Sequence, residues 1–380
     1  MSELVGLLST SSSAGQLLVY EISLPGRLVT QAQAVQKKKA FIWYLPAPAG
    51  VLPTGAAIGL GYTALAVKLH VLLGTWERMT VGDREAHVGY IRSYQTGDPS
   101  PESYWGSGAF VDTPLVDSLV RSASLSPSPV QQVSTIRNAV RAESKQAIAS
   151  LIQVGASPRF RYTDLPDSVE GVRFFLESFD WQTPWSAGGQ ASALAMLLAS
   201  GHGSAPREAE AQLLGTIRRF FRALLDPATG AYFSGPRPDH GNLVNGAMKV
   251  LTALDWLGEP VHAPERLIDT CLAALPSHEG CHLVDAAYVL HQCRQRTDHR
   301  ATDVSDYARA LLEMIRLHHN PDGGFSYWIG KSQTSYYGVP ITAGMPVSDI
   351  HGTVLLTWAL AMVLRLIGDD TAPSLGMIRP

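Results

Sequence analysis

The sequence contains few cysteines and few charged residues, and neither sign of charge dominates. Three cysteines (Cys271, Cys281 and Cys293) are too few and too scattered for a disulfide framework, which favours a reducing compartment. Charged residues make up 17% of the chain, and 30 basic against 33 acidic residues give a net charge of −3. Because there is also no basic stripe with interleaved aromatic residues, this balance argues against a nucleic-acid partner. We therefore expect a cytoplasmic protein that does not bind nucleic acid.

The composition predicts a folded chain with a sizeable core. Apolar residues make up 46% of the 380 residues, which is too high a share for a disordered protein. The length fits two or three domains of about 150 residues each, and it fits one large repeat domain equally well.

Signals for a membrane or for secretion are weak. Met1–Gly15 has neither a basic region nor a sustained apolar region, so we expect no secretory signal. The longest apolar run, Val51–Leu73, contains Lys68 and His70, which favours a helix buried in a large core over a membrane span. The triplet Lys37–Lys39 leaves contact with a membrane surface open, without a span.

A repeated unit runs through the chain: one helix, a loop rich in glycine, proline and aromatic residues, then a second helix. In the copy formed by Ala209–Leu225 and Asn242–Leu257, the first helix is amphipathic and the second is more apolar. An amphipathic helix covers a more apolar one, so this alternation predicts two concentric layers of helices. The other copies are expected at Glu85–Val120, with Ala109–Val120 as its buried helix, and at Val169–Ala199, Glu265–Arg294 and Ser305–Leu366.

These repeats predict an all-α fold, an (α/α)6-type toroid. We place the toroid at residues 51–368, after an N-terminal segment at 1–50 and before a tail at 369–380. Period-two alternation is nearly absent, so little sheet is expected. The candidate for a small N-terminal strand pair is Leu17–Leu28, together with Phe41–Leu45.

Polar residues at the starts of the buried helices are candidates for a functional site, because these starts gather at one mouth of such a ring. Asp349 and His351 open the last helix, whose following positions are almost wholly apolar, and Asp285 precedes a run of small residues. A purely structural role explains each residue as well as a functional one does. Asp349 can be a helix N-cap, and Asp285 and His351 can be buried groups whose hydrogen bonds are made within the core. In the functional alternative, His351 is an acid or base held by Asp349 and assisted by Asp285.

The same reasoning predicts a wider substrate-binding surface around that mouth. Asn242, Asn245 and Lys249 fall on one helix face, and aromatic residues gather in the loops, where they either pack or stabilise positive charge. The expected binding residues are Trp185, Gln190, Asp239, His240, Asn242, Asn245, Tyr288, Tyr327 and Trp328.

Two segments resemble the terpenoid cyclases and the β subunits of protein prenyltransferases, which share an α/α toroid. His282–Gln292 is similar to the prenyltransferase stretch that supplies a zinc-binding Asp and Cys, with Asp285 at the Asp position and Ala287 at the Cys position. Ser348–Leu360 is similar to the segment with that family's zinc-binding His, here His351, and to the Asp-x-Asp-Asp-Thr-Ala motif of class II cyclases. With the thiolate missing, no cofactor is predicted, and zinc at Asp285 and His351 stays an alternative.

The first functional hypothesis follows from this resemblance. It is a terpenoid cyclase- or prenyltransferase-like enzyme whose apolar cavity takes a hydrophobic, isoprenoid-like substrate for cyclisation, isomerisation or elimination. The second is a saccharide-active α/α-toroid hydrolase or lyase, in which Asp180, Asp239, His240 or Asp285 does the acid–base work. The third is a non-catalytic binding or assembly module, and by analogy with other toroids a partner subunit stays open.

Overall fold

A computed structural model describes residues 44–97, 105–123, 129–202 and 207–380. The described chain is mostly helical. Its strands are β1 (Ser335–Tyr336) and β2 (Val339–Pro340), which pair antiparallel as a hairpin. The predicted strand at Leu17–Leu28 lies outside the described residues, and Tyr44 and Leu45 are not in a strand.

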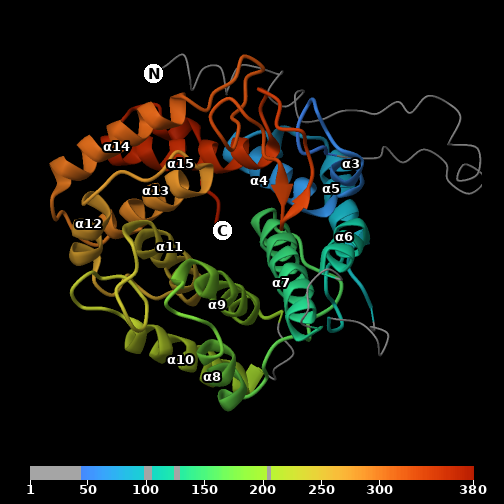
Figure 1. Ribbon diagram of the computed structural model, residues 1–380, viewed down its shortest axis with the longest axis horizontal. Helices are drawn as coiled ribbons and strands as arrows, with labels where there is room; N and C mark the ends of the chain where they lie inside the picture. Colours follow the sequence, from blue (N-terminus) through green and yellow to red (C-terminus); the bar gives the residue numbers. More distant parts are fainter. Residues whose placement is uncertain (1–43, 98–104, 124–128, 203–206) are drawn as a thin grey trace, which may run out of the picture.

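Of the described helices, six form a closed inner ring (Figure 1). Each inner helix contacts the next in chain order, and the last returns to the first. The inner helices are α4 (Leu60–Leu72), α7 (Pro129–Gln153), α9 (Pro184–Ala199), α11 (His240–Leu257), α13 (Gly280–Arg294) and α15 (Ile350–Ile367). This ring confirms the predicted α/α toroid.

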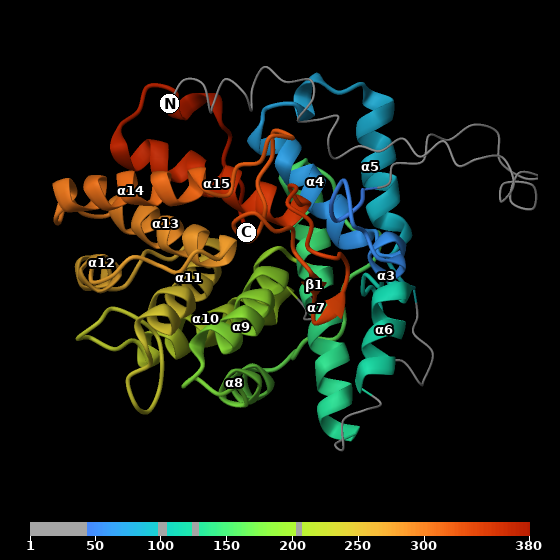
Figure 2. The same ribbon diagram turned by 45° about the horizontal axis from the view of Figure 1, so that its top comes forward.

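A second layer of described helices lies outside this ring (Figures 1 and 2). Most of these helices are amphipathic and turn their apolar side inward, as the repeat pattern predicts. They are α5 (Val81–Ser93), α6 (Thr113–Ala123), α8 (Val169–Glu177), α10 (Arg207–Leu224), α12 (Pro264–Leu272) and α14 (Ala301–Arg316). The short helices α3 (Pro53–Ala57), η1 (Trp76–Arg78) and η2 (Ala372–Ser374) complete the described helices.

One inner helix was assigned wrongly from the sequence. The stretch Ala109–Val120 was expected inside, but its helix, α6, lies in the outer layer and exposes Asp117. The inner place belongs to α7, which is polar in sequence yet buries Arg141 and Glu143. The polar side chains of α7 are buried because other elements pair with them, which a hydrophobic pattern cannot reveal.

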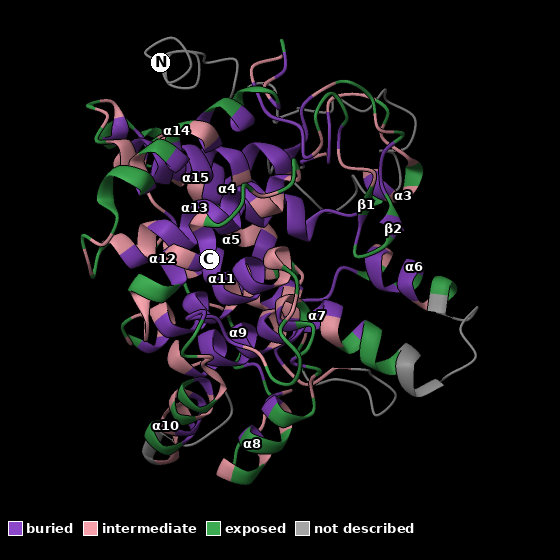
Figure 3. Ribbon diagram, turned by 60° about the vertical axis from the view of Figure 1, so that its left-hand side comes forward, coloured by how far each residue is buried: buried purple, intermediate pink, exposed green. Residues whose placement is uncertain are grey.

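The most apolar runs lie at the centre of the molecule, as the burial colours of Figure 3 show for α15 and α4. By length and composition α15 could cross a membrane, but 72% of it is buried inside the fold. The run Val51–Leu73 ends in α4, where Lys68 and His70 are buried. The expectation of a buried core helix there is confirmed.

Small residues bring α9 and α11 especially close together. A methyl group on Gly188 would lie 2.8 Å from Cβ of Lys249, and one on Gly246 would lie 2.6 Å from Cβ of Pro184. Both distances are shorter than a carbon–carbon contact allows, so side chains at these positions would force the helices apart. This close approach fixes where the Lys249 stem leaves α11.

The two ends of the ring are built differently. At one end the inner helices begin, and the long connection from α14 to α15 carries the β1–β2 hairpin. At the other end the inner helices finish, and the segment Leu375–Pro380, here called the floor segment, crosses beneath them. Its backbone is bonded to Leu72 at the end of α4 and to Gln153 at the end of α7.

Candidate functional site

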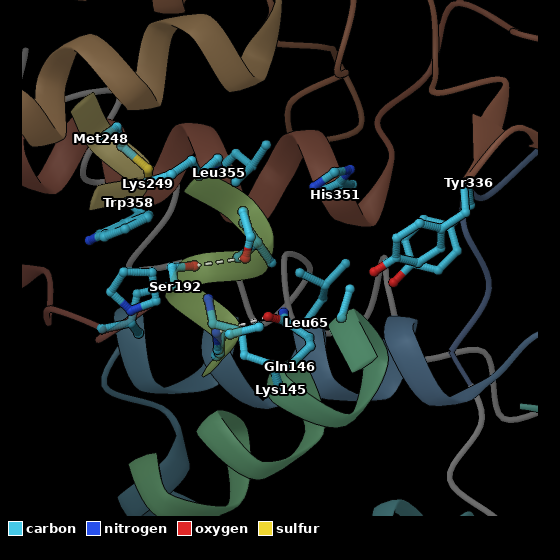
Figure 4. A pocket seen from close by; sticks show the side chains of 18 of the residues that line it. Leu65, Lys145, Gln146, Ser192, Met248, Lys249, Tyr336, His351, Leu355 and Trp358 are labelled. Carbon is cyan, nitrogen blue, oxygen red and sulfur yellow. Dashed lines mark hydrogen bonds between the residues drawn. The ribbon is translucent and has the colours of Figure 1, made fainter. Parts of the chain in front are cut away.

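A cavity of about 380 Å³ lies at the centre of the ring (Figure 4). Five of the six inner helices line it, together with the β1–β2 hairpin region and the floor segment. Its apolar lining includes Leu65, Met248, Val354, Leu355, Trp358 and Ile378. Its polar lining is Lys68, Lys145, Gln146, Gln190, Ser192, Lys249, Gln333, Tyr336, Tyr337 and His351. The predicted central cavity is therefore present, and its largely apolar lining carries polar groups at these positions.

Three lysines converge on this cavity from three different inner helices. Burial lowers the pKa of Lys68 to about 8, and its ammonium group donates to Gln146 Oε1 at 3.1 Å. Burial lowers the pKa of Lys145 well below its usual range, and the charges of Lys68 and Lys249 lower it further. No acidic residue is found among the described residues that line the cavity. The cavity is therefore suited to an anionic ligand.

Lys249 also holds the buried carboxylate of Asp285 on the neighbouring helix α13. Lys249 Nζ lies 3.8 Å from Asp285 Oδ1, and neither carboxylate oxygen has a hydrogen-bond partner among the described residues. Burial raises the pKa of Asp285 to about 6, although the charge of Lys249 opposes this shift. Asp285 therefore lies behind the lysine and does not line the cavity.

His351 lines the cavity from the first turn of α15. Its Nδ1 lies 3.1 Å from Gln333 Oε1, and with that oxygen as the acceptor the ring proton is assigned to Nδ1, which leaves a lone pair on Nε2. The Tyr327 ring stacks on the imidazole, with centroids 5.5 Å apart. Burial, followed by the charge of Lys249, lowers the pKa of His351 to about 4. The imidazole is therefore neutral at neutral pH and can accept a proton.

Asp349, expected to hold His351 directly, acts through the backbone instead. It caps α15: Oδ1 accepts from Gly352 N at 2.7 Å, and Oδ2 accepts from Tyr327 N at 2.7 Å and Gln333 N at 2.9 Å. These bonds fix Tyr327 and Gln333, the two residues that contact the imidazole. Asp349 is therefore the N-cap of α15, one of the two alternatives that the sequence left open, and its side chain reaches His351 only through Tyr327 and Gln333.

The β1–β2 hairpin brings two tyrosines to the cavity. The residues between the strands, Tyr337 and Gly338, have φ values of 49° and 80°, which is unfavourable for a tyrosine and marks a tight primed turn. Tyr336 donates a short hydrogen bond to Glu143 Oε1 on α7. The absence of a side chain at Gly61 makes room for the Tyr336 hydroxyl, which a methyl group there would overlap.

Glu143 is a buried carboxyl group behind the two tyrosines. It is 1% exposed, and burial raises its pKa to about 7 even though the bond from Tyr336 opposes the shift. Burial and then the charge of Glu143 raise the pKa of both Tyr336 and Tyr337 well above the usual value. The tyrosines therefore remain protonated, and Glu143 exchanges a proton near neutral pH.

Most of the predicted binding residues lie away from the cavity. Gln190 lines it and accepts from Arg141 at 3.0 Å. Tyr327 does not line the cavity but stacks on His351, which does, and Trp328 packs edge-on against Tyr327. Tyr288 is buried against Trp358. The others are placed as follows: Asp239 caps α11 and binds Asn242, His240 contacts the Thr270 carbonyl, Trp185 packs on His282, and Asn245 is buried. Asp180, named only for the saccharide alternative, binds Gln182 N in an exposed turn.

Among the described residues, no group of three His, Cys, Asp or Glu side chains is arranged to hold a metal ion. The charge of Lys249 acts on the pKa of both Asp285 and His351, the two residues suggested as zinc ligands. The three cysteines are free thiols.

Comparison with known proteins gives little further information. No family model and no curated sequence matches this chain. One similar solved structure is a polysaccharide lyase, with 11% identity, a TM-score of 0.40, and 96% of this chain and 97% of that chain covered. Another is a possible member of the GH105 family from Salmonella enterica subsp. enterica serovar Paratyphi A, with 13% identity, a TM-score of 0.38, and coverages of 96% and 93%.

The expectation of a terpenoid cyclase- or prenyltransferase-like enzyme with an isoprenoid substrate is wrong. The similar solved structures carry the names of a polysaccharide lyase and a GH105 protein, and neither is a terpenoid cyclase or a prenyltransferase. The lysines in the cavity lining, Lys68, Lys145 and Lys249, were also not expected for a hydrocarbon substrate.

Proposed function

We propose that the central cavity is the active site of a saccharide lyase, an enzyme that cleaves an acidic saccharide by β-elimination. The observation that carries this proposal is the cavity lining: three lysines reach it, and no Asp or Glu side chain does among the described residues. Glycoside hydrolysis usually requires two carboxyl groups that flank the scissile bond. Elimination next to a carboxylate requires cations that neutralise that carboxylate, a base and an acid.

The chain offers a residue for each of these tasks. Lys68 and Lys249 would bind the substrate carboxylate and stabilise the charge that builds up on it when the neighbouring carbon loses its proton. The negative charge of that carboxylate would favour the protonated form of Lys145, which would then join them. Gln190 and Gln146 would bind sugar hydroxyls through their amides, and the Trp358 ring offers an apolar face to a sugar ring.

The reaction uses His351 as the base. Its unprotonated Nε2 takes the proton from the carbon that bears the carboxylate, and the electrons of that C–H bond form a carbon–carbon double bond. The adjacent C–O bond breaks, and the departing oxygen takes the proton of the Tyr336 hydroxyl. Glu143 in its protonated form returns a proton to Tyr336 through their hydrogen bond. No water is consumed. Afterwards His351 releases its proton to solvent and Glu143 takes one up, so both residues return to their starting states.

The test is a panel of uronate-containing polysaccharides, each paired with the same polymer after its carboxyl groups are reduced. Ultraviolet absorbance follows the conjugated double bond, and a reducing-end assay follows cleavage. We expect both signals to rise together for an acidic polymer and neither to rise for its reduced partner. New reducing ends without absorbance would indicate the hydrolase alternative. No cleavage of any acidic polymer would reject the proposal.

A further inference from the structure

We infer that the floor segment closes the cavity at one end, so that the enzyme removes units only from the end of a saccharide chain. This inference rests on the proposed function. It concerns a different part of the molecule, because the floor segment lies at the end of the ring opposite Tyr336 and His351.

The floor segment is tied to the ends of four inner helices. Gly376 N donates to Leu72 O of α4 at 2.7 Å, and Arg379 N donates to Gln153 Oε1 of α7 at 2.9 Å. Trp256 Nε1 of α11 donates to Pro380 O at 2.7 Å, and Arg365 of α15 donates to Leu375 O at 2.8 Å. Each partner lies in or beside the last turn of its helix. The segment therefore bridges the ring at the end where its helices finish (Figure 1, label C).

Arg379 is the main anchor of this segment. Its Nε lies 2.6 Å from Asp255 Oδ2, and its guanidinium group stacks over the Trp256 ring at 4.1 Å. Both partners belong to α11, so one side chain is held by an ion pair and a cation–π contact on the same helix. With Arg379 held outside, the residues on either side of it, Ile378 and Pro380, line the cavity. Ile378 is only 7% exposed.

A cavity closed in this way restricts how a polymer can bind. A polysaccharide cannot pass through the ring, and 380 Å³ is near the lower end of the range of about 300 to 1,000 Å³ for small-molecule sites. Only a chain end can reach the three lysines, with the rest of the chain leaving through the mouth. The floor therefore sets how many units lie beyond the reacting bond.

The size of the earliest products tests this inference. The acidic polymer that is cleaved best is sampled during the first few per cent of the reaction, for viscosity and for product length by mass spectrometry. We expect short products from the start and a viscosity that falls only in proportion to the double bonds formed. A steep early loss of viscosity with long products would overturn the inference while leaving the lyase function intact. Absence of any double bond would instead reject the lyase function.

Two variants test the role of the floor itself. Ile378→Trp adds bulk to the floor, which leaves less room beyond the reacting bond and should shorten the initial products. Arg379→Ala releases the anchor and should lengthen the initial products. Arg309→Ala is the matched control, because it removes an exposed Arg309–Asp306 ion pair on α14 and should not change the product lengths. If both floor variants remain folded by thermal unfolding and keep the original product lengths, the floor does not determine where the chain is cut.

Discussion

Lys249 and Asp285 form an ion pair between two inner helices, with Nζ 3.8 Å from Oδ1. The sequence suggested that Asp285 and His351 would become neighbours, and Lys249 is the residue that links them. Its charge lowers the pKa of His351 and limits the rise in the pKa of Asp285. The ammonium group of Lys249, which lines the cavity, therefore acts on both His351 and Asp285.

The first prediction concerns Asp285→Asn. Burial raises the pKa of this carboxyl from 3.8 to about 6, so ionising it in the folded state costs ~3 kcal/mol at neutral pH. A raised carboxyl pKa means that stability is lost as the pH rises from about 4 to about 6. The variant should therefore gain unfolding free energy relative to the unaltered protein as the pH rises through this window. Thermal unfolding at pH 4 and pH 7 measures this difference in unfolding free energy between the two proteins. The same difference at both pH values would show that ionising Asp285 does not destabilise the fold.

The second prediction is that Lys68→Met stabilises the protein and weakens ligand binding. Burial lowers the Lys68 pKa from 10.5 to about 8, so the ammonium form costs ~3 kcal/mol below that pH. Methionine fills a similar volume without the charge, and we expect a gain of ~1–3 kcal/mol in unfolding free energy at pH 7. The KM for the acidic substrate should rise at least 10-fold. Lys331→Met, at an exposed position, should change both quantities little. Loss of stability in Lys68→Met would contradict this account.

The third prediction concerns the Tyr336–Glu143 pair. Tyr336→Phe removes the proton donor and should lower kcat about 100-fold or more, with little change in KM. Tyr307→Phe is the matched control, because its hydroxyl bonds the Ala274 carbonyl at 2.9 Å in the outer layer. An unchanged kcat in Tyr336→Phe would remove this tyrosine from the chemistry.

The fourth prediction is the pH profile of kcat/KM. The base, His351, must be unprotonated, which sets an acid limb near its pKa of about 4, and Glu143 must be protonated, which sets a basic limb near its pKa of about 7. Glu143→Gln should lower the maximum rate and remove the limb near 7. The limb then expected is that of Lys68, near its pKa of about 8. A Glu143→Gln profile with its basic limb still near 7 would show that Glu143 does not control this step.

The fifth prediction is that His351→Ala abolishes turnover without unfolding the chain. Its imidazole has one side-chain hydrogen bond, to Gln333, so its loss should cost little stability. Undiminished turnover in a folded His351→Ala protein would exclude this residue as the base.

Much of the fold could be predicted from the sequence, because helices that alternate between amphipathic and apolar character reveal two layers. The exception is α7, whose buried Arg141 is paired with Asp164 at 3.3 Å and whose Glu143 is paired with Tyr336. Such partners come from distant parts of the chain, so a pattern of polar residues on α7 did not indicate burial.

The cavity lining could be predicted near helix starts and on one polar helix face. His351 and Gln190 were expected from the first signal and Lys249 from the second, whereas Lys68 and Lys145 project from within helices and meet only because the ring closes. A signal for them was present: lysine is scarce, and of the four lysines in the described residues, three line the cavity. Lys68 in particular stands alone in an apolar helix, where an unpaired charge is rarely tolerated without a function.

The mass of the cleavage products tests the central claim most directly. β-Elimination breaks a C–O bond without adding water, so the fragment with the new double bond is one water molecule lighter than the hydrolysis fragment of the same length. For the unaltered protein acting on an acidic oligosaccharide, we predict that the masses of the two fragments add up to the mass of the substrate. Fragments whose masses add up to the substrate plus one water molecule would contradict the assignment of this cavity to elimination.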